Sequence, residues 1–135
     1  MRVQGFSVSF RDSKDESGSG LIWFINLIAL VALFSGTLIS ASHEYLFARK
    51  LTDYAEEYVL AVKALRNLNP QISVGETGKE IFLVTASQFN FSELRIRSVE
   101  EKTGNTIHAV VCATWKPPVA IVLGNKEICE EAFAR

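Results

Sequence analysis

The sequence predicts an α+β protein in which a long N-terminal helix carries a small antiparallel β hairpin or sheet packed on its distal half. Three observations lead to this fold class. A charge-free run extends from Ser17 to Ser42, the chain then continues without glycine or proline as far as Pro70, and alternating apolar residues follow the turn at residues 103–105. The predicted parts are a cytoplasmic tail with a candidate leader (1–18), a transmembrane helix (19–46), an amphipathic continuation (47–69) and an extracytoplasmic β-rich domain (70–135).

The charge-free run is long enough to cross a bilayer, because roughly 20 helical residues span a hydrocarbon core of about 30 Å. Three interpretations fit it: a permanent anchor, a pilin-like segment that later packs inside a filament, and a cleaved signal peptide. Arg11 and Lys14 would supply the basic region of a signal peptide, with its cleavage site near Ala41. The helical pattern continues through Ala41, which favours the first two interpretations.

Small and polar residues inside the run predict contacts with other helices. Ala32, Gly36 and Ser40 recur every four residues, a spacing that lets helices approach closely in lipid. Asn26 places an amide in hydrocarbon, where it needs a hydrogen-bond partner. Basic residues flank both ends of the run, so the positive-inside rule barely decides the orientation. We expect the bulkier, cysteine-bearing C-terminal part to be translocated.

The stretch after the run predicts an amphipathic continuation of the same helix. Its apolar positions step alternately by four and three, which places them on one helical face. They are Leu51, Ala55, Tyr58, Val62 and Leu65, and the opposite face carries Lys50, Asp53, Glu56, Glu57, Lys63 and Asn67. The helix should end at Asn69, because a residue before proline avoids the α region.

The remaining residues predict a small β domain. Residues 71–80 are loop-like, and residues 81–87 form a short stretch rich in β-branched side chains, which predicts a strand. Around the turn at 103–105 we expect a hairpin from Arg95 to Trp115, and the apolar face of its second strand should pack on the amphipathic helix. That face consists of Ile107, Ala109, Val111, Ala113 and Trp115. Residues 119–123 are expected to form another short strand, while residues 126–135 fit either a helix or a strand.

Two cysteines, Cys112 and Cys129, both follow the apolar run. If this part of the chain is exported, an oxidising compartment favours a bridge between them. The chain-entropy model gives a loop of this size about 3 kcal/mol of stabilisation. Two buried free thiols are the alternative, because spacing alone does not fix pairing.

The charged and nucleophilic residues indicate no enzyme. The net charge is −1 without a basic stripe, which argues against nucleic-acid binding. Residues 75–80 fail the P-loop pattern, because the glycines are too close together and Glu80 replaces the hydroxyl residue. His43 and His108 lack partners at zinc-site spacing, and no serine or cysteine is flanked by a recognisable base. We therefore expect a non-enzymatic protein without a catalytic site, cofactor, metal or small-molecule substrate.

Several segments resemble the TadE/TadG-like pilus-assembly proteins, especially their short actinobacterial forms. In those proteins an acidic-Gly-Ser-Gly stretch leads into the membrane helix, as Asp15 to Gly20 does here. The pair Ala48-Arg49 and the stretch from Ala55 to Ala61 are similar to the segment that follows that helix. The hairpin from Arg95 to Trp115 completes the resemblance.

The resemblance implies a minor pilin or pseudopilin-like component of a Tad/Flp-type pilus or secretion apparatus. Its partners would be the membrane and other pilin-like or secretion-system subunits, and it would reside in the cell membrane or in an extracellular filament. Prepilin processing would cut between Gly18 and Ser19, although the fifth residue after Gly18 is Trp23 rather than the usual glutamate. The alternatives are a membrane-anchored accessory or binding protein outside any filament, and a small domain secreted after signal-peptide cleavage.

Overall fold

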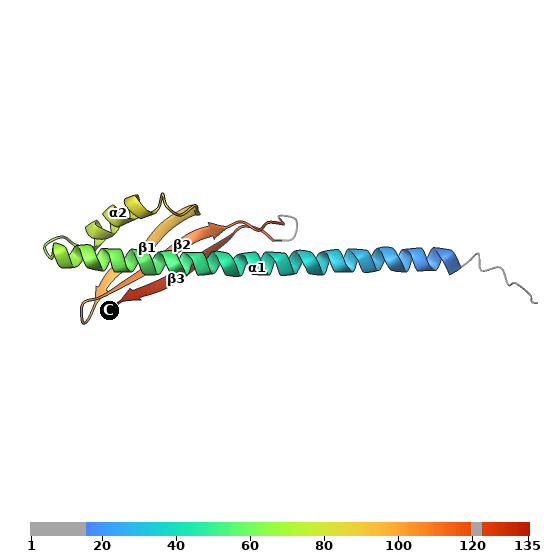
Figure 1. Ribbon diagram of the computed structural model, residues 1–135, viewed down its shortest axis with the longest axis horizontal. Helices are drawn as coiled ribbons and strands as arrows, with labels where there is room; N and C mark the ends of the chain where they lie inside the picture. Colours follow the sequence, from blue (N-terminus) through green and yellow to red (C-terminus); the bar gives the residue numbers. More distant parts are fainter. Residues whose placement is uncertain (1–15, 120–122) are drawn as a thin grey trace, which may run out of the picture. The chain divides into compact units, whose positions relative to one another are not determined.

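The computed structural model describes residues 16–119 and 123–135. It contains two helices, α1 (Glu16–Leu68) and α2 (Val74–Thr85), and three strands, β1 (Ser92–Lys102), β2 (Thr106–Trp115) and β3 (Lys126–Ala134). The strands form one antiparallel sheet in the order β1-β2-β3, as Figure 1 shows. The predicted α+β fold class is therefore confirmed. The chain divides into two compact units, residues 1–37 and residues 38–135.

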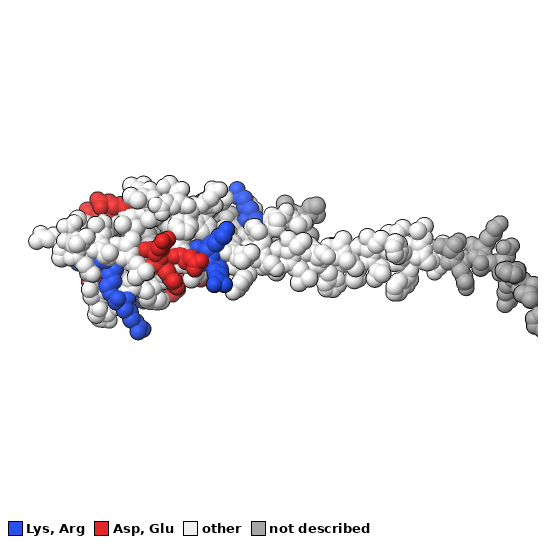
Figure 2. Space-filling model, in the orientation of Figure 1, with Lys and Arg blue, Asp and Glu red and all other residues white. Residues whose placement is uncertain are grey.

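Within the N-terminal unit, α1 exposes apolar side chains on all of its faces. The helix is long and apolar enough to cross a membrane, and none of its most apolar window is buried. Its polar side chains bond to the helix's own carbonyls: Asn26 Nδ2 donates to Ile22 O at 3.0 Å, and Ser35 Oγ donates to Val31 O at 2.8 Å. Such bonds satisfy polar groups that would otherwise lack a partner in hydrocarbon. The coloured charges in Figure 2 gather on the residues beyond this stretch.

The core of the distal unit lies between the second half of α1 and the sheet. Four of the five apolar helical positions predicted from the spacing are buried here, with Tyr54 and Val59 beside them, whereas Leu65 is only partly buried. They pack against the inward side chains of β2 and β3, as expected for the hairpin. The helical members are Leu51, Tyr54, Ala55, Tyr58, Val59 and Val62, and the strand members are Ile107, Ala109, Val111, Ala113, Ala132 and Ala134.

The predicted hairpin is present as β1 and β2. Ile96 faces Val111 across the two strands, and the connecting turn has positive φ at Gly104 (85°) and Asn105 (60°). Glycine and asparagine are the residues that adopt this backbone region most readily, which explains why the chain reverses here. The pairing of β1 with β2 changes register twice, once between Ser92 and Arg95 and once between Ile96 and Ser98.

The predictions of a strand at residues 81–87 and of a loop at residues 71–80 are wrong, because α2 occupies most of both ranges. Ser73 caps this helix: its side chain accepts a hydrogen bond from Glu76 N at 3.3 Å. The β-branched residues follow a well-capped first turn, so tertiary packing and the cap override their strand propensity. Tyr54 reaches α2 through its hydroxyl, 3.1 Å from Thr85 Oγ1.

The C-terminal segment, which fitted either a helix or a strand, forms β3. Pairing with β2 settles the choice, because Cys129 lies directly opposite Cys112 and Ala132 opposite Ala109. The residues then alternate between an inner face and an outer face of the sheet. The strand expected at 119–123 falls largely on residues 120–122, which lie outside the described residues.

Candidate functional site: an apolar helix face and a disulfide-bonded sheet

The four residues predicted to pack against other helices differ in exposure. Asn26 and Ala32 are exposed, and a Cβ added at Gly36 would meet no atom within 4 Å. Ser40 is only 2% exposed. Asn26, Ala32 and Gly36 are therefore the members that the helix surface offers to a partner.

A shallow hollow surrounds Asn26 on the surface of α1. Trp23, Leu27 and Leu30 line it with Asn26, and its volume is about 210 Å³. These residues are spaced three and four apart, so they share one helical face. The bond to Ile22 O uses one hydrogen of the Asn26 amide, and the amide keeps a second hydrogen and an oxygen for a neighbouring helix.

Gly18 and Ser19, the candidate processing residues, lie near the start of α1 and are exposed. Apart from its chain neighbours and the backbone of its own helix, no described atom lies within 4 Å of the position where a Gly18 Cβ would be.

Two long-range contacts join α1 to the sheet at the end of the distal unit nearest the charge-free run. Trp115 Nε1 donates to His43 Nδ1 at 2.9 Å, and Lys126 Nζ donates to Glu44 Oε1 at 2.6 Å. Sequence reasoning missed both contacts, because the partners are more than 70 positions apart. The contacts fix the ends of β2 and β3 against one turn of α1.

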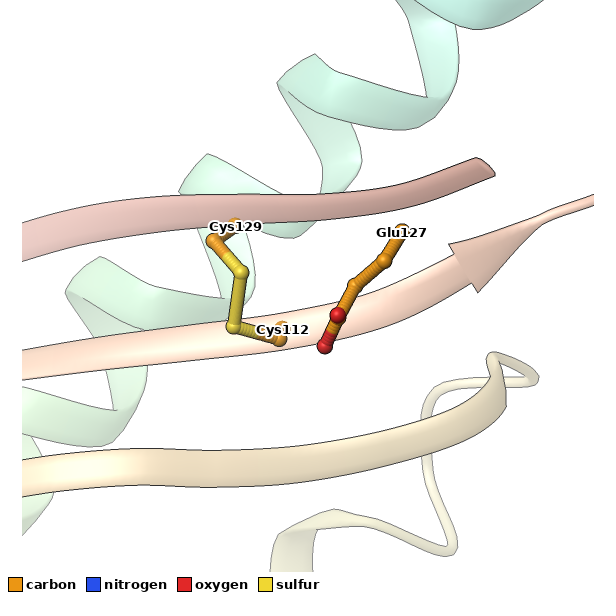
Figure 3. Close-up of side chains that lie close together, drawn as sticks. All are labelled: Cys112, Glu127 and Cys129. Atoms are coloured by element: carbon orange, nitrogen blue, oxygen red, sulfur yellow. A yellow bond between two sulfur atoms is a disulfide. The ribbon is translucent and has the colours of Figure 1, made fainter. Parts of the chain in front are cut away.

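The predicted disulfide joins Cys112 on β2 to Cys129 on β3. Figure 3 shows the bridge between the two strands, with the Glu127 side chain beside it. The two cysteine sulfurs and one carboxylate oxygen of Glu127 lie within 4.8 Å of one another. Cysteine binds a metal as a thiolate, and both sulfurs are joined in the disulfide, so this group of residues does not suit a cation. Glu127 instead accepts a hydrogen bond from Arg95 Nε at 2.9 Å.

His108 lies on the outer face of β2, as predicted, but it is covered. The Phe133 ring stacks on it with centroids 4.5 Å apart, and Glu131 Oε2 is 3.5 Å from its Nε2. The Phe133 side chain is itself half exposed, so its ring rather than solvent covers the His108 imidazole. His43 accepts its hydrogen bond from Trp115 at the other end of β2, so the two histidines do not lie in one site.

A groove of about 450 Å³ lies between α2 and β1. Tyr58 reaches it from α1, and its buried hydroxyl has no hydrogen-bond partner among the described residues. Burial, and to a smaller extent the neighbouring Tyr54, raises the pKa of Tyr58 to about 12. Gly78 passes directly over this hydroxyl, since a Cβ there would lie 2.5 Å from Tyr58 Oη. The two glycines that loosely resemble a phosphate loop thus lie inside α2, and Gly78 serves close packing.

No family model, curated protein or solved structure matched this chain. The described residues combine an exposed apolar stretch of α1 with a small sheet that is held by one disulfide. Four basic residues, Arg66, Arg95, His108 and Lys126, each lie within ion-pair distance of a glutamate, and His108 also stacks on Phe133.

Proposed function

We propose that the protein is a single-pass envelope protein anchored by the first half of α1, with its N-terminus in the cytoplasm and the distal unit outside. The supporting observation is that one helix, α1, combines an exposed apolar half with a half that forms the core of a disulfide-bonded sheet unit. A disulfide is typical of an exported domain, which supports the outward orientation.

Within the envelope, the protein acts as a minor pilin or pseudopilin-like component of a Tad/Flp-type pilus or secretion apparatus. The TadE-like sequence features support this role, together with an anchor helix on which Asn26 and Ala32 are exposed and Gly36 is partly exposed. Small residues on one face permit close helix approach in lipid, and an amide adds about 1 kcal/mol or less per interhelical hydrogen bond. The partners are other pilin-like or secretion subunits that present matching helices.

The first test replaces Gly36 with leucine and measures cross-linking to pilus or secretion subunits in native membranes. A side chain there would hold a partner helix away, so cross-linking should fall. Thr37→Leu is the matched control, because it adds a similar side chain about 100° further around the helix. Equal cross-linking in both variants and the unaltered protein would refute the packing face.

The second test is the intact mass of the protein from membranes and from the medium. A membrane species that begins at Ser19 supports prepilin-type processing and a filament role. A full-length membrane species indicates a permanent anchor and favours an accessory protein outside a filament. A released species beginning near Ser42 would overturn membrane anchoring altogether.

A further inference from the structure

We propose that the groove between α2 and β1 is a binding site for a small amphipathic carboxylate, a ligand with an apolar body and one carboxylate group. The apolar body lies against Phe82 and Ile96, and the carboxylate pairs with Lys79 and Arg97. The site lies within the distal unit, and it goes beyond the proposed envelope function because it requires neither the membrane nor a pilus partner.

The groove has one wall from a strand and one from a helix. The strand wall consists of six consecutive residues of β1, Leu94 to Val99. Alternate residues of a strand point to opposite faces, so a groove lined by consecutive residues follows the edge of the strand, and β1 is an edge strand of the sheet. The helix wall is made by Gly75, Gly78, Lys79 and Phe82. Their spacing of three and four places them on one face of α2.

The volume and the apolar side chains of the groove suit a small ligand. Its volume is about 450 Å³, and sites for small molecules occupy about 300–1,000 Å³ and are lined mainly by apolar side chains. Four apolar residues line this groove, and each is only partly buried, so each keeps part of its surface open. They are Phe82, Leu94, Ile96 and Val99. An apolar body bound against them removes this surface from water, which favours binding.

Gly75 keeps the helix wall of the groove open. Glycine is less favourable than alanine inside a helix, so a glycine there needs a reason. At Gly78 the reason is packing, since a Cβ would lie 2.5 Å from Tyr58 Oη. At Gly75 a Cβ would meet nothing within 4 Å, so packing within the described chain does not require a glycine. Gly75 lines the groove, and the missing side chain leaves space there for a ligand.

The charged residues that line the groove are all basic. They are Lys79, Arg95 and Arg97, and no acidic residue is among the described residues that line it. Arg95 is paired with Glu127. Lys79 and Arg97 are exposed, and neither forms an ion pair with another described residue. The groove therefore offers two unpaired cations beside apolar surface, which is complementary to an anion with an apolar body.

A β-bulge sets Arg97 apart from its neighbours in β1. Ile96 and Ser98 pair with two consecutive residues of β2, Val111 and Val110, so Arg97 is the extra residue between them. Bulges are common beside binding sites, where they re-aim a side chain. Arg97 and Lys79 come from opposite walls, so each can pair with one oxygen of a carboxylate held between them.

The test measures how fast Lys79 reacts with an acetylating N-hydroxysuccinimide ester in the full chain in lipid nanodiscs, read by peptide mass spectrometry. The probe is 4-phenylbutyrate. Its neutral amide removes the charge, and acetate removes the apolar body. Lys63 and Lys116, which do not line the groove, are references within the same sample. The probe should slow the reaction of Lys79 saturably and leave both references unchanged, whereas the amide and acetate should not slow it at the same concentrations.

Two variants connect this protection to the groove. Gly75→Leu should abolish it, because the leucine side chain fills the groove, whereas Ser87→Leu adds the same side chain at an exposed position outside the groove and should retain it. Arg97→Gln should weaken binding of the probe about two- to fivefold, the range for loss of an exposed ion pair, and Lys116→Gln should not weaken it. Near-ultraviolet circular dichroism checks the fold of each variant, and Arg97→Gln decides the test if Gly75→Leu fails to fold.

Three results would overturn the proposal: no saturable protection of Lys79, equal protection by the probe and its amide, or equal protection of all three lysines. Protection that persists unchanged in folded Gly75→Leu and in Arg97→Gln would also overturn it. None of these results bears on the cross-linking and mass measurements that test the envelope function, so the two proposals fail separately.

Discussion

Replacing Gly78 with alanine should destabilise the distal unit, whereas the same replacement at Gly75 should stabilise it. Both glycines lie in α2. A Cβ at Gly75 would meet nothing within 4 Å, but at Gly78 it would lie 2.5 Å from Tyr58 Oη and 3.1 Å from Val99 Cγ1. Tyr58 is 1% exposed and packs in the core, so its rigid ring cannot move aside without displacing its core neighbours.

The magnitudes follow from two opposing effects. Alanine is favoured over glycine inside a helix by about 1 kcal/mol, and this gain applies at both positions. Forcing an extra methyl group into a packed core costs about 1–3 kcal/mol, and this cost applies only at Gly78. The free energies of unfolding of the two variants should therefore differ by about 1–3 kcal/mol. For a domain of this size, each 1 kcal/mol shifts Tm by about 4–8 °C.

The assay is thermal unfolding of the full chain in detergent micelles, followed by near-ultraviolet circular dichroism with the disulfide intact. Tyr58→Phe provides the decisive background, because it removes the atom nearest to the added methyl group. In that background the difference in Tm between the two glycine variants should narrow, because the 2.5 Å contact with Tyr58 Oη is gone and the 3.1 Å contact with Val99 Cγ1 remains. If Gly78→Ala raises Tm as much as Gly75→Ala, the packing of α2 over Tyr58 is refuted.

Three further predictions concern the same unit. Reduction of the Cys112–Cys129 bridge should cost about 3 kcal/mol by the chain-entropy model, so Tm should fall with reductant, and a double alanine variant should show no such fall. Trp115→Phe removes the donor to His43 and should cost about 1 kcal/mol in denaturant unfolding; an unchanged midpoint would argue against that bond. Tyr58 has a pKa raised from 10.0 to about 12 in the folded state, so its contribution to stability is complete below pH 10 and is lost between about pH 10 and 12. Tyr58→Phe should flatten the alkaline part of the stability profile, and a profile identical to that of the unaltered protein would contradict the assignment.

The helix and the hairpin were predictable because their side-chain periods are local. The steps of three and four from Leu51 to Val62 and the alternation from Ile107 to Trp115 both mark buried faces, and the structure packs these faces together. Each pattern is long enough to separate a helical period from a strand period.

The second helix was not predicted, because its composition suggests other structures. Gly75 and Gly78 are typical of a loop, and the β-branched residues after them are typical of a strand. The glycine at 78 is required by Tyr58, a residue 20 positions away whose contact no local pattern shows. The Ser73 cap and Glu76 were the available signals, and they mark the start of a helix.

Of the candidate site, sequence reasoning could predict the small-residue spacing in the anchor and the pair of cysteines, but not which face stays open. Ser40 belongs to the predicted line with Ala32 and Gly36, yet it is only 2% exposed. The contacts of His43 and Glu44 with the ends of β2 and β3 were not predicted either, because they join distant segments. Long-range contacts of this kind leave no periodic trace in the sequence.

The arrangement of the core also sets an order of events during synthesis. The helical half of the core is complete at Val62, while the strand that covers it begins only at Thr106. Ribosomes add about 5–20 residues per second, so the intervening stretch of roughly 45 residues takes about 2–9 s to make. During those seconds the leucine, valine and tyrosine side chains on the inner face of the new helix have no sheet to cover them. The core of the distal unit therefore closes only after most of the chain has been made.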